Sequence, residues 1–157
     1  MHQMRRNDRA MTESEAWEFL KQQEVGRLAM IADSEPYVVP LNYVVLGESI
    51  YFHSAREGLK IEAMRESPRV CFLVDQLIDI KSGTTACDFS AYYRSALARG
   101  RAELLQDIEE KTRILNALTL KYARGREFEP ASSDGLMPTA VVQIHVQHIT
   151  GKQLLPQ

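Results

Sequence analysis

Three short stretches of the chain combine polar side chains with residues that interrupt strand-like patterns. They are PYVVPLNYVV at 36–45, YFHSAREGLK at 51–60 and YYRSALARG at 92–100. Ligand sites in proteins are mostly apolar surfaces with a few precisely placed polar groups. The three stretches are therefore the first places to look for chemistry.

The second stretch has the features of an anion site. Its hydrophobic strand pattern stops after 51–52, Ser54 follows, and a helical pattern begins after Gly58. The first N–H groups of a helix are free and its dipole favours an anion there, while Arg56 and Lys60 supply positive charge. We interpret this stretch as a phosphate-binding nest, with a plain helix N-terminus and solvated basic residues as the other interpretation.

The first and third stretches offer backbone groups and hydroxyls. Pro40 lies within a strand pattern, which indicates an edge strand or a bulge, and Asn42 is polar in an apolar run. A flat heteroaromatic ligand could lie against such a backbone, although an ordinary edge strand fits the pattern too. In the third stretch Tyr93 and Ser95 carry hydroxyls, and Gly100 permits either a bend or a close backbone approach.

No nucleotide-binding or metal-binding motif occurs in the chain. The four histidines are His2, His53, His145 and His148. His145 and His148 are three residues apart on a predicted strand, so we expect them on opposite faces. Cys71 and Cys87 form no C-x-x-C pair, and we expect two free thiols rather than zinc ligands or a disulfide framework.

Length and composition predict one domain over residues 1–157, with residues 1–10 as a flexible tail. The chain is 45% apolar, as in globular proteins, and its net charge of −2 gives no basic field for nucleic acid. No apolar run has the length of a membrane span, and the polar N-terminus does not resemble a secretory signal. We therefore expect a cytoplasmic protein that binds neither nucleic acid nor membrane.

The elements that must position these stretches are mainly strands. Helices are predicted over 12–23, 58–66 and 107–123, the first from the Thr12-x-x-Glu15 capping box. Strands are predicted over 25–32, 37–46, 49–53, 69–75, 92–105 and 139–150, with 77–80 as a further candidate. Strands and helices do not alternate, so we expect an α+β fold, mainly β with short helices, in a closed or nearly closed antiparallel sheet of about six or seven strands.

Taken in this order, the segments resemble the FMN-binding split barrel of the pyridoxamine 5′-phosphate oxidase-like superfamily, and most of all its nitroimidazole-resistance (nitroimidazole reductase-like) group. The resemblance spans about residues 9–150. It is carried by GRLAM at 26–30, PYVVPLNYV at 36–44, IYFHSAREGLKIEAM at 50–64, RVCFLVD at 69–75 and YRSALARGRAELL at 93–105. It implies a split β-barrel and a homodimer with FMN at the subunit interface.

The residues that the resemblance implies for cofactor binding follow the three stretches in chain order. They are Pro40, Leu41, Asn42 and Tyr43 at the isoalloxazine ring; His53, Ser54 and Ala55 at the ribityl chain and ring edge; Gly58 and Lys60 at the phosphate; and Tyr93 and Ser95, which complete the site. His53 is also the implied catalytic residue, as a proton donor or a substrate contact. No metal site is implied.

The implied activity is an FMN-dependent oxidoreductase that reduces a small acceptor, such as a nitroaromatic compound, with reduced nicotinamide. The arginine-rich phosphate motif of pyridoxamine phosphate oxidases is absent, so we do not expect that specific activity. The alternatives are a reductase that uses the deazaflavin F420 and a flavin- or haem-binding module without enzymatic activity. For haem, His53, His145 and His148 are the candidate axial ligands.

Overall fold

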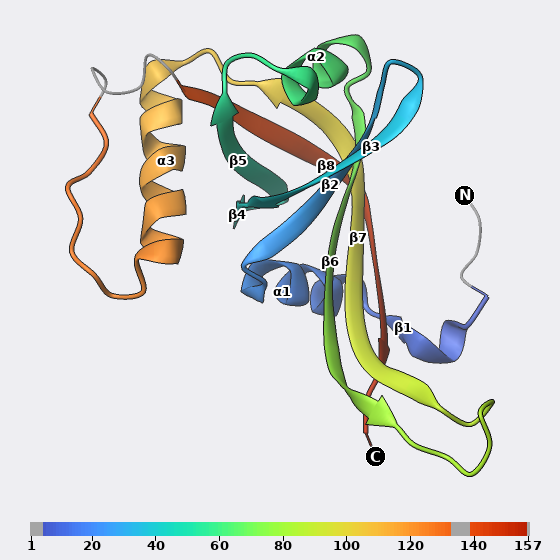
Figure 1. Cartoon of the computed structure of the whole chain (residues 1–157). Helices are drawn as coiled ribbons and strands as arrows, with labels where there is room; N and C mark the ends of the chain where they lie inside the picture. Colours follow the sequence, from blue (N-terminus) through green and yellow to red (C-terminus); the bar gives the residue numbers. More distant parts are fainter. Residues whose placement is uncertain (1–4, 133–138, 157) are drawn as a thin grey trace.

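The computed structural model describes residues 5–132 and 139–156, which fold into eight strands and three α-helices (Figure 1). The helices are α1 (Glu13–Gln22), α2 (Leu59–Glu66) and α3 (Ile108–Ala123), preceded by a 3₁₀ turn at Asn7–Arg9. The strands are β1 (Ala10–Met11), β2 (Val25–Ala32), β3 (Glu35–Asn42), β4 (Val44–Leu46), β5 (Ser49–Ala55), β6 (Arg69–Lys81), β7 (Ser90–Leu104) and β8 (Thr139–Leu154). All pairings between these strands are antiparallel.

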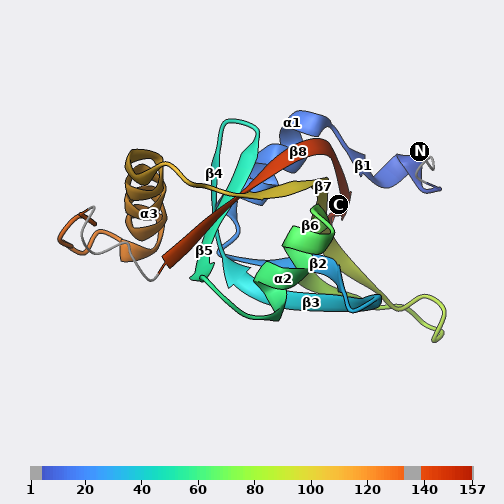
Figure 2. The same cartoon turned by 90° about the horizontal axis from the view of Figure 1, so that it is seen from above.

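The sheet curls into an open barrel whose two ends are neighbours in the sequence. Its order is β3-β2-β6-β7-β8-β5-β4, with β1 added to β8. The end strands β3 and β4 are separated in the chain by Tyr43 alone. The sheet therefore comes round almost to closure and remains split beside this residue, as the view from above shows (Figure 2). This confirms the predicted α+β split barrel.

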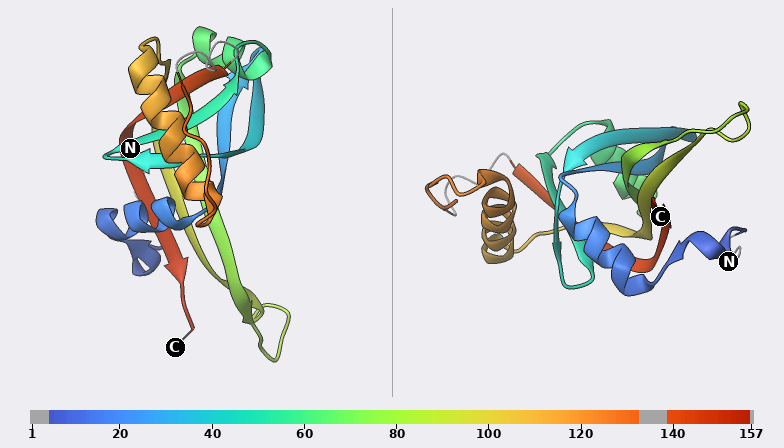
Figure 3. Two further views of the ribbon diagram at one scale, coloured as in Figure 1. Left: turned by 90° about the vertical axis from the view of Figure 1, so that its left-hand side faces the viewer. Right: turned by 90° about the horizontal axis from the view of Figure 1, so that it is seen from below.

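Two apolar clusters hold the elements in place. The larger cluster fills the barrel, where the rings of Tyr43 and Phe72 meet edge to face with centroids 4.8 Å apart. The smaller one lies between α3 and the outer side of the β4–β5–β8 end, where Ile114 and Leu118 pack with Tyr51. Helix α3 consequently stands beside the barrel next to the split (Figure 3).

Helix α1 begins at the predicted capping box. The Glu15 N–H donates to Thr12 Oγ1 at 3.2 Å, and the Thr12 N–H donates to Glu15 Oε2 at 2.6 Å. The helix buries Ala16, Phe19 and Leu20 in the larger cluster. It thereby covers one end of the barrel.

Strands β6 and β7 continue beyond the barrel as a two-stranded arm, seen at the bottom of Figure 1. Every residue from 75 to 90 is exposed, including Leu77 (63%) and Phe89 (55%). The candidate strand at 77–80 is therefore real, and it belongs to the longer strand β6. The arm has no buried face that could give its sequence an alternating pattern.

The expected flexible tail over residues 1–10 is corrected at its inner end. Asn7–Arg9 form the 3₁₀ turn, and Ala10–Met11 pair with β8 at Lys152 and Gly151. Residues 1–4 lie outside the described residues. The chain is thus paired with the sheet from Ala10 onward.

His145 and His148 share one face of β8, which corrects the expectation of opposite faces. They pair with Arg101 and Arg99, two residues that are two apart on β7 and so point the same way. The register shifts between Arg99 and Gly100, where β8 carries one extra residue. Such a bulge reverses the alternation of side chains beyond it. Gly100 makes the close approach possible, because a Cβ there would lie 2.1 Å from the His145 carbonyl oxygen.

Candidate functional site

The split in the barrel brings the first two polar stretches together. Val44 pairs with Tyr51, and continuing this antiparallel register places Asn42 opposite His53. The β4–β5 ladder stops before this point because β3 pairs with β2 on its other side, where Pro40 faces Arg27. Asn42 and His53 both line a cavity of about 690 Å³. This volume lies in the range of small-molecule sites, about 300–1,000 Å³.

The free edge of β3 supplies the polar wall of the split. Proline cannot donate to a ladder, so Pro40 must occupy a non-hydrogen-bonded pair with Arg27. Its carbonyl then points away from β2, and so do the backbone N–H and C=O of Asn42, two residues on. This confirms Pro40 as an edge-strand residue. It also leaves a row of backbone groups that can read the rim of a planar ligand.

The side chain of Tyr43 stabilises the fold next to the split. The ring is fully buried and its hydroxyl donates to the Leu20 carbonyl. Burial raises the pKa of this hydroxyl. The backbone N–H of Tyr43 donates to the Tyr122 hydroxyl at 2.9 Å. In contrast to the expectation for a ring-lining residue, the Tyr43 side chain therefore presents no surface to a ligand.

Helix α2 starts beside the split at Gly58. This glycine has φ 108° and ψ 166°, a conformation that side chains disfavour, and its carbonyl accepts from the Ile61 N–H at 2.8 Å. The Lys60 ammonium lies 5.8 Å from the centroid of the Phe52 ring on β5, and partial burial lowers its pKa. The predicted anion nest thus has a helix start and a partly desolvated ammonium next to the strand that carries His53. Ser54 is half-buried on that strand.

Leu41, Ala55, Tyr93 and Ser95 complete the set of predicted site residues. The register of β4 and β5, continued past Tyr43, places Leu41 near Ser54, and Ala55 is exposed at the end of β5. Ser95 sits opposite Lys152 on β8, whereas His53 sits opposite Val141.

These two positions on β8 are eleven residues apart, or about 35 Å of strand at about 3.3 Å per residue. Tyr93 is two residues further from the split than Ser95. The structure therefore brings the first two stretches together and leaves Tyr93 and Ser95 of the third at the far end of the sheet.

Helix α3 contributes a wall of the cavity through Leu115, Leu118 and Tyr122, which were not among the predicted site residues. The Tyr122 hydroxyl lies 2.7 Å from the Glu24 carbonyl oxygen and 2.9 Å from that of Tyr43. The neighbouring Lys121 ammonium donates to the Gln23 carbonyl at 2.7 Å and lies 4.0 Å from the Tyr43 ring centroid. Burial lowers the pKa of Lys121 to about 8. These contacts join residues some 80–100 positions apart, so no local pattern predicts them.

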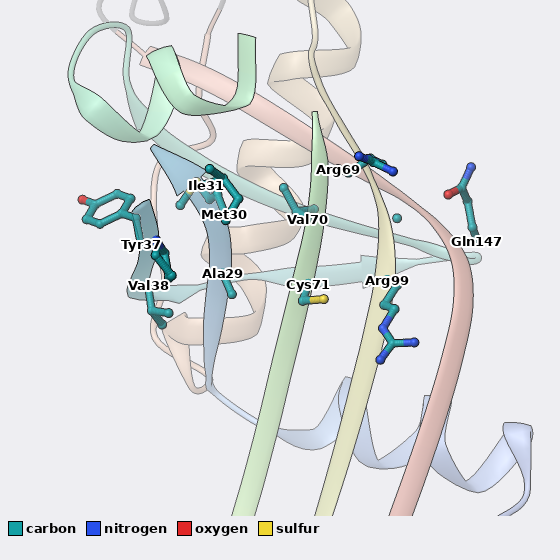
Figure 4. Close-up of a pocket in the computed structure, with 12 residues that line it drawn as sticks. Ala29, Met30, Ile31, Tyr37, Val38, Arg69, Val70, Cys71, Arg99 and Gln147 are labelled. Atoms are coloured by element: carbon teal, nitrogen blue, oxygen red, sulfur yellow. The ribbon is translucent and has the colours of Figure 1, made fainter. Parts of the chain in front are cut away.

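A second cavity, of about 470 Å³, lies on the outer face of β2, β3, β6 and β7 (Figure 4). Apolar side chains such as Val38 and Cys71 line one half, and Arg69 and Arg99 line the other with Gln147. Val38 is 57% exposed there. None of the predicted cofactor-binding residues lines this cavity.

Two further findings concern metal ions and membrane spans. Within the described ranges, no group of three or more His, Cys, Asp or Glu side chains lies close enough to hold a metal ion. None of the helices in that part of the chain combines the length and the apolar character needed to cross a bilayer.

Solved structures of similar fold include flavin-binding proteins. A FAD-binding protein from Mesorhizobium loti is 30% identical with a TM-score of 0.70, over 93% of this chain and 97% of that one. A candidate 5-nitroimidazole antibiotic resistance protein from Bacteroides thetaiotaomicron is 26% identical with a TM-score of 0.78, over 91% of this chain and 85% of that one. A FAD- and haem-binding protein from Mycobacterium smegmatis, 20% identical with a TM-score of 0.84 over 95% and 76%, shares the fold.

Among curated proteins, an uncharacterized protein of Rhizobium meliloti is 36% identical over 62 residues. The matched stretch covers 40% of this chain and 40% of that relative. The family model described as pyridoxamine 5′-phosphate oxidase matches residues 12–153, nearly the whole chain. With a split barrel whose first two polar stretches meet at the opening, and with this match over most of its length, the chain belongs to the pyridoxamine 5′-phosphate oxidase family.

Proposed function

We propose that this chain is a flavin-dependent oxidoreductase that binds FMN in the split between β3 and β5 and works as a homodimer. The proposal rests on one observation: Asn42 and His53 line the same cavity, and α2 begins shortly after β5, the strand that carries His53. The FAD-binding protein and the candidate 5-nitroimidazole resistance protein of the same fold support it.

The residues at the split fit FMN group by group. The free edge of β3 from Pro40 to Asn42 offers alternating donors and acceptors to the rim of the isoalloxazine ring. Gly58 and Lys60 offer backbone N–H groups and an ammonium to the phosphate. Bound there, FMN would supply hydride or electron transfer from reduced nicotinamide to a small acceptor such as a nitroaromatic compound.

His53 is the side chain best placed to handle a proton in this site. Its ring is exposed at the cavity and stands opposite the polar edge of β3. An imidazole can donate or accept a proton, so His53 can protonate a reduced acceptor or hold it by a hydrogen bond. Either role requires His53 to touch the substrate.

In the proposed homodimer, Tyr93 and Ser95 of the third polar stretch can reach the flavin site of the second copy. Tyr93 and Ser95 lie some eleven residues of strand from His53 in one chain, so they complete the site only when a second copy supplies them. The exposed apolar residues of the β6–β7 arm, and the exposed Val38 on the outer sheet face, form a surface that a second copy can cover.

The phosphate site is tested by the double variant Ser54→Ala with Lys60→Ala. We expect FMN affinity to fall on the order of a hundredfold, because a charge-assisted contact and a hydroxyl donor are lost together. The matched control is Ser14→Ala with Lys21→Ala on the exposed side of α1, where the same groups are removed away from the split. Equal FMN affinity in the two double variants would show that the phosphate lies elsewhere.

A further inference from the structure

A small basic cavity lies on another side of helix α2. It has a volume of about 80 Å³ and is lined by Arg56 from the loop before α2, Arg65 near its end and Lys111 from the first turns of α3. The chain from 104 to 106 and Ala140 form the rest of its wall. Of the stretch predicted as an anion nest, Arg56 lines this cavity, whereas Ser54, Gly58 and Lys60 do not.

The three cations have no counter-charge in the part of the chain that the structure describes. None of them takes part in an ion pair there, and no carboxylate lines the cavity. Lys111 is only 9% exposed, and its backbone N–H donates to the Asp107 carbonyl oxygen. Three like charges at one small cavity repel one another, and a bound anion would relieve this repulsion.

We propose that this cavity is a phosphate-binding subsite formed by Arg56, Arg65 and Lys111. Guanidinium groups bind phosphate oxygens in pairs, and the Lys111 ammonium adds a compact charge. The volume corresponds to about two to three water molecules at about 30 Å³ each, which suits one phosphate group.

The subsite is distinct from the proposed FMN phosphate site. Lys60 and Arg65 are five residues apart on α2, which places them about 140° apart around the helix axis at about 100° per residue. The two basic side chains therefore serve different faces of the helix. The loop 56–58 connects the two sites along the chain.

The phosphate has two possible sources. One is the second phosphate of a dinucleotide flavin such as FAD, and this part of the inference rests on the proposed flavin function. The other is free phosphate or a phosphorylated small molecule, whose binding is independent of that function.

The test is calorimetric titration of inorganic phosphate into the FMN-saturated full chain, in which the flavin phosphate site is already filled. We expect saturable binding in excess over chloride at matched ionic strength. Lys111→Met and Arg65→Gln should each weaken it on the order of tenfold or more. Arg113→Gln removes an exposed charge from α3, the helix that carries Lys111, and should leave phosphate binding unchanged. Lys111→Arg keeps the charge and should retain binding.

Parallel titrations of FAD and FMN separate the two sources. A loss of FAD affinity in Lys111→Met with unchanged FMN affinity assigns the site to the second phosphate of the dinucleotide. Unchanged affinity for both flavins, with phosphate binding lost, assigns it to a free phosphate group. Absence of phosphate binding in the native chain, or binding that is equal in Arg65→Gln and Arg113→Gln, would overturn the inference. If no flavin binds, the proposed function fails while the phosphate titration of the flavin-free chain still decides this site.

Discussion

His53 is the residue on which the proposed chemistry depends most. Replacing it with Gln keeps a polar side chain at the cavity but removes proton transfer. We expect the turnover of a nitroaromatic acceptor to fall on the order of a hundredfold, as is common when a general acid is lost. FMN affinity should change by no more than a few fold, because the phosphate and the ring edge are held elsewhere. Steady-state kinetics and flavin titration of the same preparation measure both quantities.

A variant in which flavin affinity falls together with turnover would assign His53 to cofactor binding. A variant with unchanged turnover would remove it from the site altogether.

The lowered pKa of Lys121 predicts how the free energy of unfolding depends on pH. Burial lowers its pKa from 10.5 in the unfolded chain to about 8 in the folded chain. Between these values the unfolded chain holds a proton that the folded chain has lost, so the free energy of unfolding rises with pH across this window. The ammonium is half-exposed, and solvent screening limits the rise to about 1 kcal/mol. Urea unfolding followed from about pH 8 to about pH 10 measures it.

Lys121→Met supplies the comparison, because it keeps an apolar stem over the Tyr43 ring without a titrating group. Its stability should rise less over the same window. Equal slopes for the native chain and the variant would contradict the lowered pKa of Lys121.

At the scale of single residues, the sequence predicts local contacts better than it predicts which side chains are buried in the core. The capping box at Thr12 and Glu15 is confirmed because it is local. Tyr43 lies in an apolar run next to Asn42, and nothing local reveals that its ring turns into the core. The shared face of His145 and His148 escapes prediction because one bulged residue reverses the strand alternation.

Among the elements, α3 makes side-chain contacts with the backbone at the split. The Tyr122 hydroxyl contacts the backbone of Tyr43 and Glu24 and thereby ties α3 to the point where β3 passes into β4. Tyr122→Phe removes these contacts while keeping the ring. We expect a loss of about 1–3 kcal/mol in the free energy of unfolding, since the partly buried N–H of Tyr43 is left without its partner.

The same variant should bind FMN more weakly, because α3 also walls the cavity. The control is Tyr92→Phe, which removes a hydroxyl at the start of β7, far from α3. A Tyr122→Phe protein as stable as that control would mean that α3 is held by its apolar contacts alone.

The element boundaries divide into those with a local signal and those without one. Strand β2 matches the predicted 25–32, because the turn residues Asp33 and Ser34 mark its end in the sequence. Strand β6 runs to Lys81, six residues past the predicted end, because its outer part lies in the arm and buries neither face. The break at Tyr43 follows from the curling of the whole sheet, and no pattern within 37–46 specifies it.

For the whole molecule, the exposed arm predicts association between copies. Leu77 and Ile80 are 63% and 54% exposed on β6, where a second chain is proposed to pack. The double variant Leu77→Lys with Ile80→Lys should shift the chain from dimer to monomer in light scattering. It should also lose FMN, because Tyr93 and Ser95 of the second copy no longer reach the split.

Leu120→Lys is the matched control, since Leu120 is 69% exposed on α3, away from the arm. It should remain a dimer that binds FMN. A monomeric native chain that binds one flavin tightly would contradict the proposed interface.

The most direct test of the central claim is the visible spectrum of the purified full chain after reconstitution with FMN. We predict one bound flavin per chain, with absorption that bleaches on addition of reduced nicotinamide and returns on addition of a nitroaromatic acceptor. The Ser54→Ala, Lys60→Ala protein should lose the flavin on gel filtration. A chain that stays colourless, or that shows a haem Soret band and no flavin, would contradict the account.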